Sequence, residues 1–247
     1  MEYILAIDDT DNLDSPGTGE HLENITALLE DRHDCVCSRV TRHQLFFSPL
    51  VKYTSHNSAM SAIISTDRTP DEVFGAACAY LEQNAAEGSD PGACLLIKDA
   101  VSEIAAETLA AYGQRAKSEY IEKSEAYALA AKHDILLKEL GGEGIGVIGA
   151  LAGAALRLGG NDGRYKGNFE VGVNFDNMLC ADILSHPYID HIMLEDGTAV
   201  PKDEEVYITE QIKTVHLAGQ SVLLVKRQQT VDGEALVNLA KSELKKY

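Results

Sequence analysis

An apolar run that ends in a cluster of carboxylates is the most constraining feature of this sequence. Residues 3–7 read Tyr-Ile-Leu-Ala-Ile and predict a buried strand, and Asp8, Asp9 and Asp11 follow directly. Carboxylates held close together repel one another and raise each other's pKa. A divalent cation would relieve that repulsion, and Mg²⁺ commonly binds through one or two carboxylates plus substrate phosphates. We therefore favour a Mg²⁺–nucleotide site, with the three aspartates as metal ligands and catalytic residues.

A glycine-containing loop follows the aspartates and leads into a predicted helix. Residues 12–20 read Asn-Leu-Asp-Ser-Pro-Gly-Thr-Gly-Glu, and apolar residues spaced by three and four within residues 21–30 predict the helix. The amides and the dipole at a helix N-terminus favour anions. The loop contains no Gly-Lys-Ser/Thr, so it is not a Walker P-loop. The residues that we expect to bind the nucleotide here are Thr10, Gly17, Thr18 and Gly19.

Both features have a simpler interpretation. Aspartate and threonine side chains often bond to local amides in turns, and Asp11, Ser15 or Thr18 could merely cap the predicted helix or its loop. Three aspartates within four residues are dense for a plain turn. We therefore favour the metal site and keep the turn as the alternative.

A second glycine segment precedes a run of small residues. Gly144, Gly146 and Gly149 match the spacing of a dinucleotide fingerprint, but that fingerprint has meaning only between the strand and the helix of a βαβ unit. The preceding residues 135–140 favour a helix over a strand. Because glycines let a backbone approach phosphate oxygens, we predict that the three glycines bind phosphate or substrate. The alternative is close packing of a small-residue helix at 150–158.

Four short segments match motifs of one known family, in the same order along the chain. Residues 6–12 resemble Gly-Ile-Asp-Asp-Thr-Asp-Ser, and residues 52–59 resemble Lys-Thr-Arg-Gly-Asn-Gly-Ala. Residues 90–93 resemble Asn-Pro-Gly-Ala, and residues 144–152 resemble Gly-Arg-Gly-(Leu/Ile)-Ile-Gly-Ala-Leu-Ala. The family is that of the archaeal isoleucine-tRNA agmatinylcytidine synthetases. The first and fourth motifs are specific, and the resemblance covers residues 1–157.

In that family a kinase-like domain uses ATP to phosphorylate the wobble cytidine, and agmatine then displaces the phosphate. The resemblance implies a kinase-like nucleotide lobe beside a ferredoxin-like lobe, with ATP and Mg²⁺ as cofactors. It also implies that the three aspartates of the first motif hold the Mg²⁺-ATP. Within the second motif, Lys52 could neutralise nucleotide phosphates, and His56 or Asn57 could contact substrate. Solvated surface side chains are the alternative for these three.

The sequence also departs from that family. The family's Cys-Thr-Thr, of which one threonine becomes phosphorylated, has no plain match near Thr18. Its arginines in the second and fourth motifs are replaced by Thr54 or Ser55 and by Ile145. We expect its nucleic-acid-binding and zinc-binding modules to be absent from a chain that ends at Tyr247. These differences leave a non-catalytic nucleotide- or metabolite-binding module as the main alternative to an enzyme, and a dinucleotide-dependent oxidoreductase as the third.

The charge of the chain bears on its partners. With 21 basic and 39 acidic residues, the formal net charge is −18, and the cations are scattered, whereas nucleic-acid binding needs them clustered. The absence of tryptophan and the presence of only five phenylalanines leave few side chains for base stacking. We therefore expect a small-molecule substrate and no nucleic-acid partner.

The remaining composition is that of a globular protein. A length of 247 residues with 45% hydrophobic residues predicts one large domain or two small ones. The sequence has no apolar stretch that could cross a bilayer and no signal peptide at its N-terminus. Five cysteines are odd in number and sparse, which favours reduced thiols. We predict a cytoplasmic protein that does not associate with membranes, and a homodimer is a further hypothesis.

Hydrophobic periodicity predicts an α+β fold with two lobes. Strands are predicted at 3–7, 34–40, 44–47, 59–65, 93–97, 169–175, 206–209 and 222–225. Helices are predicted at 21–30, 69–84, 99–112, 118–140, 150–158 and 233–246. We assign residues 1–65 and 118–170 to the kinase-like α/β nucleotide lobe, and residues 66–117 and 171–247 to the ferredoxin-like lobe.

The function that the sequence favours is Mg²⁺-ATP-dependent transfer of a phosphoryl group to a small acceptor. Activation of that acceptor for amine attack is a further hypothesis. Phosphoryl transfer depends mostly on positioning and charge neutralisation. Asp8, Asp9 and Asp11 would supply these together with the two glycine segments.

Overall fold

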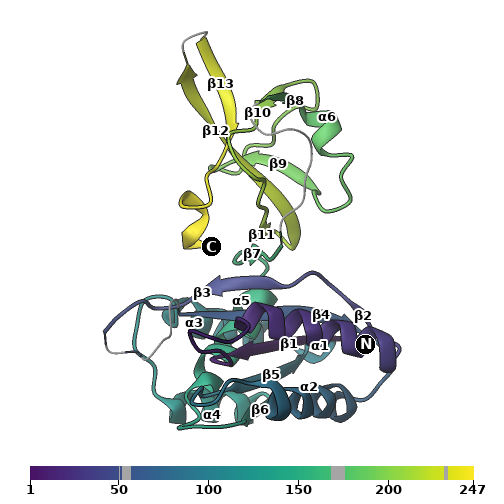
Figure 1. The fold of residues 1–247 in the computed structure, drawn as a ribbon, viewed down its shortest axis with the longest axis vertical. Coiled ribbons are helices and arrows are strands. Elements are labelled where there is room, and N and C mark those ends of the chain that lie inside the picture. Colours follow the sequence, from purple (N-terminus) through teal and green to yellow (C-terminus); the bar gives the residue numbers. More distant parts are fainter. Residues whose placement is uncertain (50, 52–56, 168–175, 231–232) are drawn as a thin grey trace. The chain divides into compact units, whose positions relative to one another are not determined.

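The chain folds into two compact units, Met1–Gly159 (unit 1) and Gly160–Tyr247 (unit 2) (Figure 1). The computed structural model describes residues 1–49, 51, 57–167, 176–230 and 233–247. Helices and strands both build the cores, so the predicted α+β class is confirmed. The division into kinase-like and ferredoxin-like lobes at residues 65, 117 and 170 stays a prediction. None of the helices in the described ranges is both long and apolar enough to span a membrane.

Unit 1 is built on an antiparallel sheet with β1 near its centre. The strand order is β6-β5-β1-β4-β3, and β2 also pairs with β4. Asp8, the last residue of β1, is paired with Gly92 of β5. The strands are β1 (Glu2–Asp8), β2 (Val36–Cys37), β3 (Thr41–Gln44), β4 (Ser58–Ser65), β5 (Gly92–Ile97) and β6 (Leu136–Glu139).

Helices cover both faces of this sheet, which explains the uninterrupted apolar run in β1. Tyr3, Leu5 and Ile7 pack against α1 (Thr18–Arg32) and α2 (Pro70–Asn84). Ile4 and Ala6 point to the opposite face, because side chains alternate along a strand. That face is covered by α3 (Glu103–Arg115), α4 (Lys123–Lys132) and α5 (Gly146–Gly159). A short 3-10 turn, η1 (Lys98–Ala100), follows β5.

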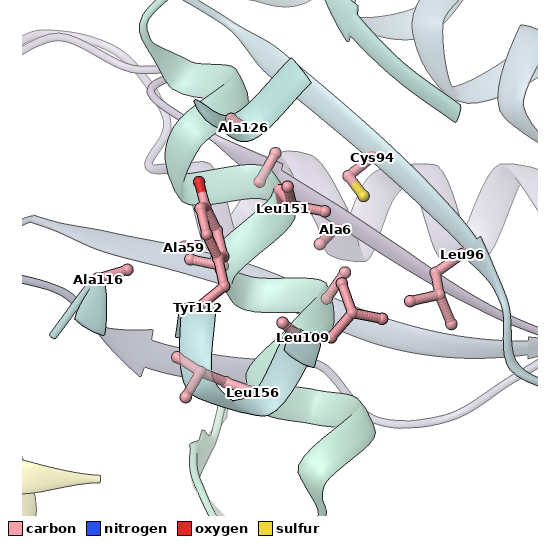
Figure 2. Packing of buried hydrophobic residues seen from close by; sticks show 14 of the residues in the cluster. Ala6, Ala59, Cys94, Leu96, Leu109, Tyr112, Ala116, Ala126, Leu151 and Leu156 are labelled. Carbon is pink, nitrogen blue, oxygen red and sulfur yellow. The ribbon is translucent and has the colours of Figure 1, made fainter. Parts of the chain in front are cut away.

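Small residues let α5 lie close to the sheet. A Cβ at Gly153 would lie 2.9 Å from Cβ of Ala59 in β4, and one at Gly113 of α3 would lie 3.0 Å from Cγ of Leu156. The packing explanation for the small-residue helix is therefore supported. Figure 2 shows this side of the core, with side chains from β1, β4, β5, α3 and α5 in contact: Ala6, Ala59, Cys94, Leu96, Leu109, Tyr112, Leu151 and Leu156.

The start of α2 follows its sequence signal. Thr69 is the N-cap, its hydroxyl accepts a hydrogen bond from the amide of Glu72, and the Glu72 carboxylate accepts one from the amide of Thr69. Pro70 occupies the first turn, where its missing N–H costs nothing. The predicted helix start is thus confirmed.

Removal of this cap is expected to destabilise unit 1. Thr69→Ala should lower the free energy of unfolding by about 1 kcal/mol, because the Glu72 amide loses its acceptor. Ser124→Ala is the matched control, since Ser124 is exposed in the first turn of α4. Urea denaturation measures both variants, and equal losses in the two would contradict the capping role.

Parts of two predicted helices are strands. Residues 136–139 form β6 because they pair with β5, so the prediction of a helix over 118–140 holds only for α4. Residues 233–238 form β13 because they pair with β12, and only a 3-10 turn, η2 (Glu243–Lys246), follows. Long-range pairing decided the conformation in both cases over local preference. The predicted strand at 169–175 lies outside the described residues.

Unit 2 is mostly strands, several of them short. The order is β7-β11-β12-β13-β10-β8, with β9 parallel to the first half of β12. Its elements are β7 (Arg164–Tyr165), β8 (Asn177–Leu179), α6 (Cys180–Ile183), β9 (His191–Leu194), β10 (Glu205–Tyr207), β11 (Val215–Leu217), β12 (Gln220–Thr230) and β13 (Gly233–Asn238). Two apolar clusters form its core, one of them around Val206 and Leu223.

The five cysteines are free thiols, as the sequence predicts. Burial raises the pKa of Cys37 to about 12 and that of Cys78 to about 11. A thiol with so high a pKa is almost wholly protonated at neutral pH and is a poor nucleophile or metal ligand. Burial therefore makes a catalytic or metal-binding role unfavourable for Cys37 and Cys78.

Candidate functional site

The chain turns sharply where β1 ends, at the aspartates. Asp8 is buried, with 9% of its surface exposed, although it carries a carboxylate. Asp9 adopts a left-handed backbone conformation with φ of 54°, which an L-residue other than glycine rarely takes without a structural requirement. Thr10 is fully buried behind it, and Asp11 is half-buried. The four residues therefore form a compact corner and not an extended, solvated loop.

Three of the four motif segments meet at this corner. Asp8 pairs with Gly92 at the start of β5. A Cβ at Gly92 would lie 2.1 Å from the carbonyl carbon of Gly146, so β5 touches the first turn of α5 through main chain alone. A Cβ at Gly149 would lie 1.8 Å from Oδ2 of Asp8. The absence of side chains at these glycines is thus what lets the Asp8 carboxylate lie against the start of α5.

The Asp8 carboxylate is held in an electrostatically unfavourable place. Burial is the main cause that raises its pKa well above the ordinary value, and the charge of Asp9 is the second. A hydrogen bond from the Asp9 amide opposes these effects, and Asp11 adds further repulsion. Folding therefore brings together carboxylates that a cation would stabilise.

The start of α1 lies next to the third aspartate. The hydroxyl of Thr18 donates a 2.7 Å hydrogen bond to Oδ1 of Asp11, and Thr18 and Gly19 are both buried. Gly17 is the N-cap, and the helix has no side-chain cap. The alternative that Asp11, Ser15 or Thr18 caps the helix or its loop is therefore wrong for the helix, whereas within the loop Ser15 Oγ accepts a 2.9 Å hydrogen bond from the Asn12 amide.

Two buried polar atoms near this corner have no hydrogen-bond partner among the described residues: Oγ1 of Thr10 and Nε2 of His21. Buried polar groups are normally paired. Nδ1 of His21 lies 3.4 Å from the Tyr80 hydroxyl, and burial lowers the pKa of this histidine. Sequence reasoning missed His21 because it lies on the apolar face of the helix, like the core residues Leu22 and Ile25.

Within the described ranges, no group of three or more His, Cys, Asp or Glu side chains is arranged to hold a metal ion. Asp8, Asp9 and Asp11 interact electrostatically, but they do not form a closed ligand set by themselves. Their role as ligands of Mg²⁺ stays a prediction.

Of the residues predicted in the second motif to contact nucleotide or substrate, the structure describes only Asn57. Asn57 is hydrogen-bonded to the segment that follows β3. Its side-chain Nδ2 donates to the carbonyl of Phe46 at 2.7 Å, and its main-chain carbonyl accepts from the amide of Leu45 at 2.9 Å. Contact of Asn57 with a nucleotide stays a prediction. Lys52 and His56 lie outside the described residues.

The side chain of Asp90 binds the main chain at the start of the second glycine segment. Oδ1 of Asp90 accepts hydrogen bonds from the amides of Glu143 and Gly144, the latter at 3.3 Å. Gly142 and Gly144 have positive φ values of 57° and 71°. The glycines at these two positions are therefore needed by internal contacts, and contact of Gly144, Gly146 or Gly149 with a phosphate stays a prediction.

Part of this chain resembles known structures in its fold, whereas the sequence matches no family model and no curated protein. The structure of apo TiaS, an agmatidine synthetase for an isoleucine tRNA, is similar with a TM-score of 0.54 and 21% identity, over 63% of this chain and 35% of that one. A tRNA fluorescent labeling enzyme and the complex of TiaS with its isoleucine tRNA and ATP each give a TM-score of 0.51 and 24% identity, over 63% of this chain and 36% of theirs. The chain thus spans about a third of these proteins.

These neighbours correct one prediction. Net charge led us to expect no nucleic-acid partner, but a structure of similar fold is solved with an isoleucine tRNA and ATP. Net charge is an average over the whole chain, whereas binding depends on the local field of one surface. The expectation from charge is therefore overturned. The resemblance seen in the four motifs is confirmed at the level of fold, which this chain shares with TiaS.

Proposed function

We propose that unit 1 binds Mg²⁺-ATP at the corner after β1 and transfers a phosphoryl group from it. The observation that carries the proposal is the buried carboxylate of Asp8. It lies against the start of α5, where Gly149 leaves room for it, and it interacts electrostatically with two further aspartates. A chain that gained nothing from this charge would be more stable with an uncharged residue there. The complex of TiaS with tRNA and ATP, whose fold is similar, supports ATP as the ligand.

The chemistry of the donor atoms at this corner fits a magnesium ion, although the side chains that the structure describes do not by themselves form a complete ligand set. The donor set consists of carboxylate oxygens, which Mg²⁺ prefers, and the ion needs only one or two of them when phosphates supply the rest. Asp8, Asp9 and Asp11 would hold it, and the bound ion would neutralise the charge of the phosphates. Burial first, and then the charge of Asp9, raise the pKa of Asp8, and a bound cation would offset both by stabilising the ionised carboxylate.

The protein groups that would hold the phosphates come from the start of α1 and from Thr10, in the corner after β1. The amides there carry the positive end of the helix dipole, and Thr18 is fixed beside Asp11 by its hydrogen bond. Oγ1 of Thr10 is a buried hydroxyl without a partner in the described structure. We infer that these groups orient the ATP, so that catalysis rests on positioning and charge neutralisation.

The acceptor of the phosphoryl group has two candidates. The sequence-based hypothesis is a small molecule, which would then be activated for amine attack. A tRNA is the second candidate, because structures of similar fold include a complex with tRNA. Turnover of ATP labelled in its γ-phosphate, with and without bulk tRNA, distinguishes these two acceptors. Binding of ATP without any turnover would favour the non-catalytic module.

The oxidoreductase alternative has little support. The dinucleotide fingerprint works at the end of a parallel strand in a βαβ unit. Here the strand before Gly144 is β6, and its described pairing with β5 is antiparallel.

Isothermal titration calorimetry tests the proposal directly. Wild-type protein is expected to bind ATP in the presence of Mg²⁺ and much more weakly with EDTA. Asp11→Asn should weaken binding roughly 10-fold or more, whereas Asp14→Asn, which removes an equal charge from an exposed position of the same loop, should stay within about twofold of wild type. If titration of the wild-type protein with ATP and Mg²⁺ released or absorbed no heat of binding, the proposed Mg²⁺-ATP site would be wrong.

A further inference from the structure

We propose that Asp90 is a positioning residue for the phosphoryl-transfer site. It fixes the loop before α5, and through it the first turn of α5 against which the Asp8 carboxylate lies. The inference rests on the proposed function for its consequence, while the contacts that define it are independent of any ligand.

The side chain of Asp90 organises the loop of residues 141–145. It is 7% exposed, and its Oδ1 accepts from the amides of Glu143 and Gly144. A Cβ at Gly142 would lie 1.7 Å from the same oxygen. The loop is therefore wrapped around one carboxylate oxygen, in the way that amide groups enclose an anion.

The main chain beside Asp90 holds both ends of the same loop. The carbonyl of Asp90 accepts a 3.1 Å hydrogen bond from the amide of Gly146, the first residue of α5. The carbonyl of Pro91 accepts one of 2.8 Å from the amide of Leu140, where β6 has just ended. Because a Cβ at Gly146 would lie 2.3 Å from the Asp90 carbonyl oxygen, this approach leaves no space for a side chain.

These contacts lead directly to Asp8. Gly92, two residues after Asp90, pairs with Asp8 in the sheet and touches Gly146. Gly149, one helical turn further along α5, lies against the Asp8 carboxylate. A shift of the first turn of α5 would thus change the space that this carboxylate occupies. Displacement of a reacting group by about 1 Å can lower a rate 100-fold.

The role depends on an oxygen acceptor and not on charge. Oδ1 makes both hydrogen bonds to the loop, and the amide oxygen of asparagine has the same position and also accepts. Asp90→Asn is therefore expected to keep the loop, while Asp90→Ala removes the acceptor and leaves two amides without it. The difference between these variants separates positioning from a general electrostatic effect.

Two measurements test the inference on the full chain. In Asp90→Ala, hydrogen exchange at the amides of Glu143 and Gly144 should accelerate at least about 10-fold, and kcat for ATP turnover should fall roughly 10- to 100-fold with little change in KM. Asp90→Asn should restore both quantities to nearly wild-type values. Asp31→Ala, an exposed carboxylate near the end of α1, is the matched control and should change neither.

The outcomes are distinguishable. Unchanged exchange in Asp90→Ala would overturn the loop-holding role. Faster exchange with unchanged kcat would overturn the positioning role while the proposed function stands. A wild-type protein that binds no Mg²⁺-ATP and turns over none would overturn the proposed function, and the positioning role with it. Equal kcat losses in Asp90→Asn and Asp90→Ala would also overturn the inference, because charge and not the acceptor would then matter.

Discussion

Asp8→Asn is expected to abolish Mg²⁺-dependent ATP turnover and, at the same time, to make the protein more stable at neutral pH. If Asp8 holds the metal as proposed, its loss should lower kcat/KM at least about 100-fold. Stability should rise because the buried charge is removed, while the asparagine oxygen can still accept from the Asp9 amide. Opposite changes in activity and stability are typical of residues kept for function.

The pH dependence of stability follows from the same carboxylate. The pKa of Asp8 is raised in the folded chain above that of the unfolded chain, so the folded state binds a proton that the unfolded state does not. The contribution of Asp8 is therefore unfavourable above its folded pKa, and it is relieved as the pH falls toward the unfolded pKa. The Asn variant should lack this part of the pH profile.

Urea denaturation in EDTA, from pH 8 down to pH 4, measures the difference between wild type and Asp8→Asn. The variant is expected to be the more stable at pH 8, and the gap should narrow as the pH falls. A variant less stable than wild type at pH 8 would contradict the electrostatic cost at Asp8. Full ATP turnover by the variant would contradict the proposed role of this aspartate.

Gly92→Ala is expected to cause the largest loss of stability among single substitutions at the site. The added Cβ would lie 2.1 Å from the Gly146 carbonyl carbon and 2.2 Å from the Val147 nitrogen. Both are main-chain atoms, so no side chain can rotate away, and β5 and α5 must separate. We expect the free energy of unfolding to fall by about 3 kcal/mol or more.

Gly75→Ala is the matched control for this prediction. Gly75 is exposed in the middle of α2, and a Cβ there would meet no atom within 4 Å. Alanine is the better helix former, so this variant should gain about 0.5–1 kcal/mol. Thermal and urea denaturation report both, and a Gly92→Ala variant as stable as wild type would show that the two backbones are not in close contact.

Local signals predicted the parts of this fold that depend on local chemistry. The strand at β1 and the start of α2 were both predicted, because each is specified by adjacent residues. The aspartates and the segment at 144–149 were identified separately as candidate sites. The structure brings them together at Asp8 and Gly149.

Sequence patterns failed where a distant partner decides the outcome. Residues 233–238 have a composition compatible with a helix, yet they form β13 because β12 lies beside them. Local patterns also did not indicate the contacts of Asp90, because its hydrogen-bond partners, Glu143 and Gly144, lie more than fifty residues away along the chain. The negative charge of the chain was informative about average composition and misleading about partners, because it says nothing about one local surface.

The central position of β1 has a consequence for the order of folding. Its two neighbours in the sheet are β4 and β5, which end at Ser65 and Ile97. During synthesis, β1 therefore lacks its first partner until β4 has been made at Ser65, and its second until β5 has been made at Ile97. Pairing over such separations gives a high contact order and slow folding, and an unpaired apolar strand is prone to aggregate. Until β4 and β5 have been made, the apolar face of β1 is consequently open to contact with other chains.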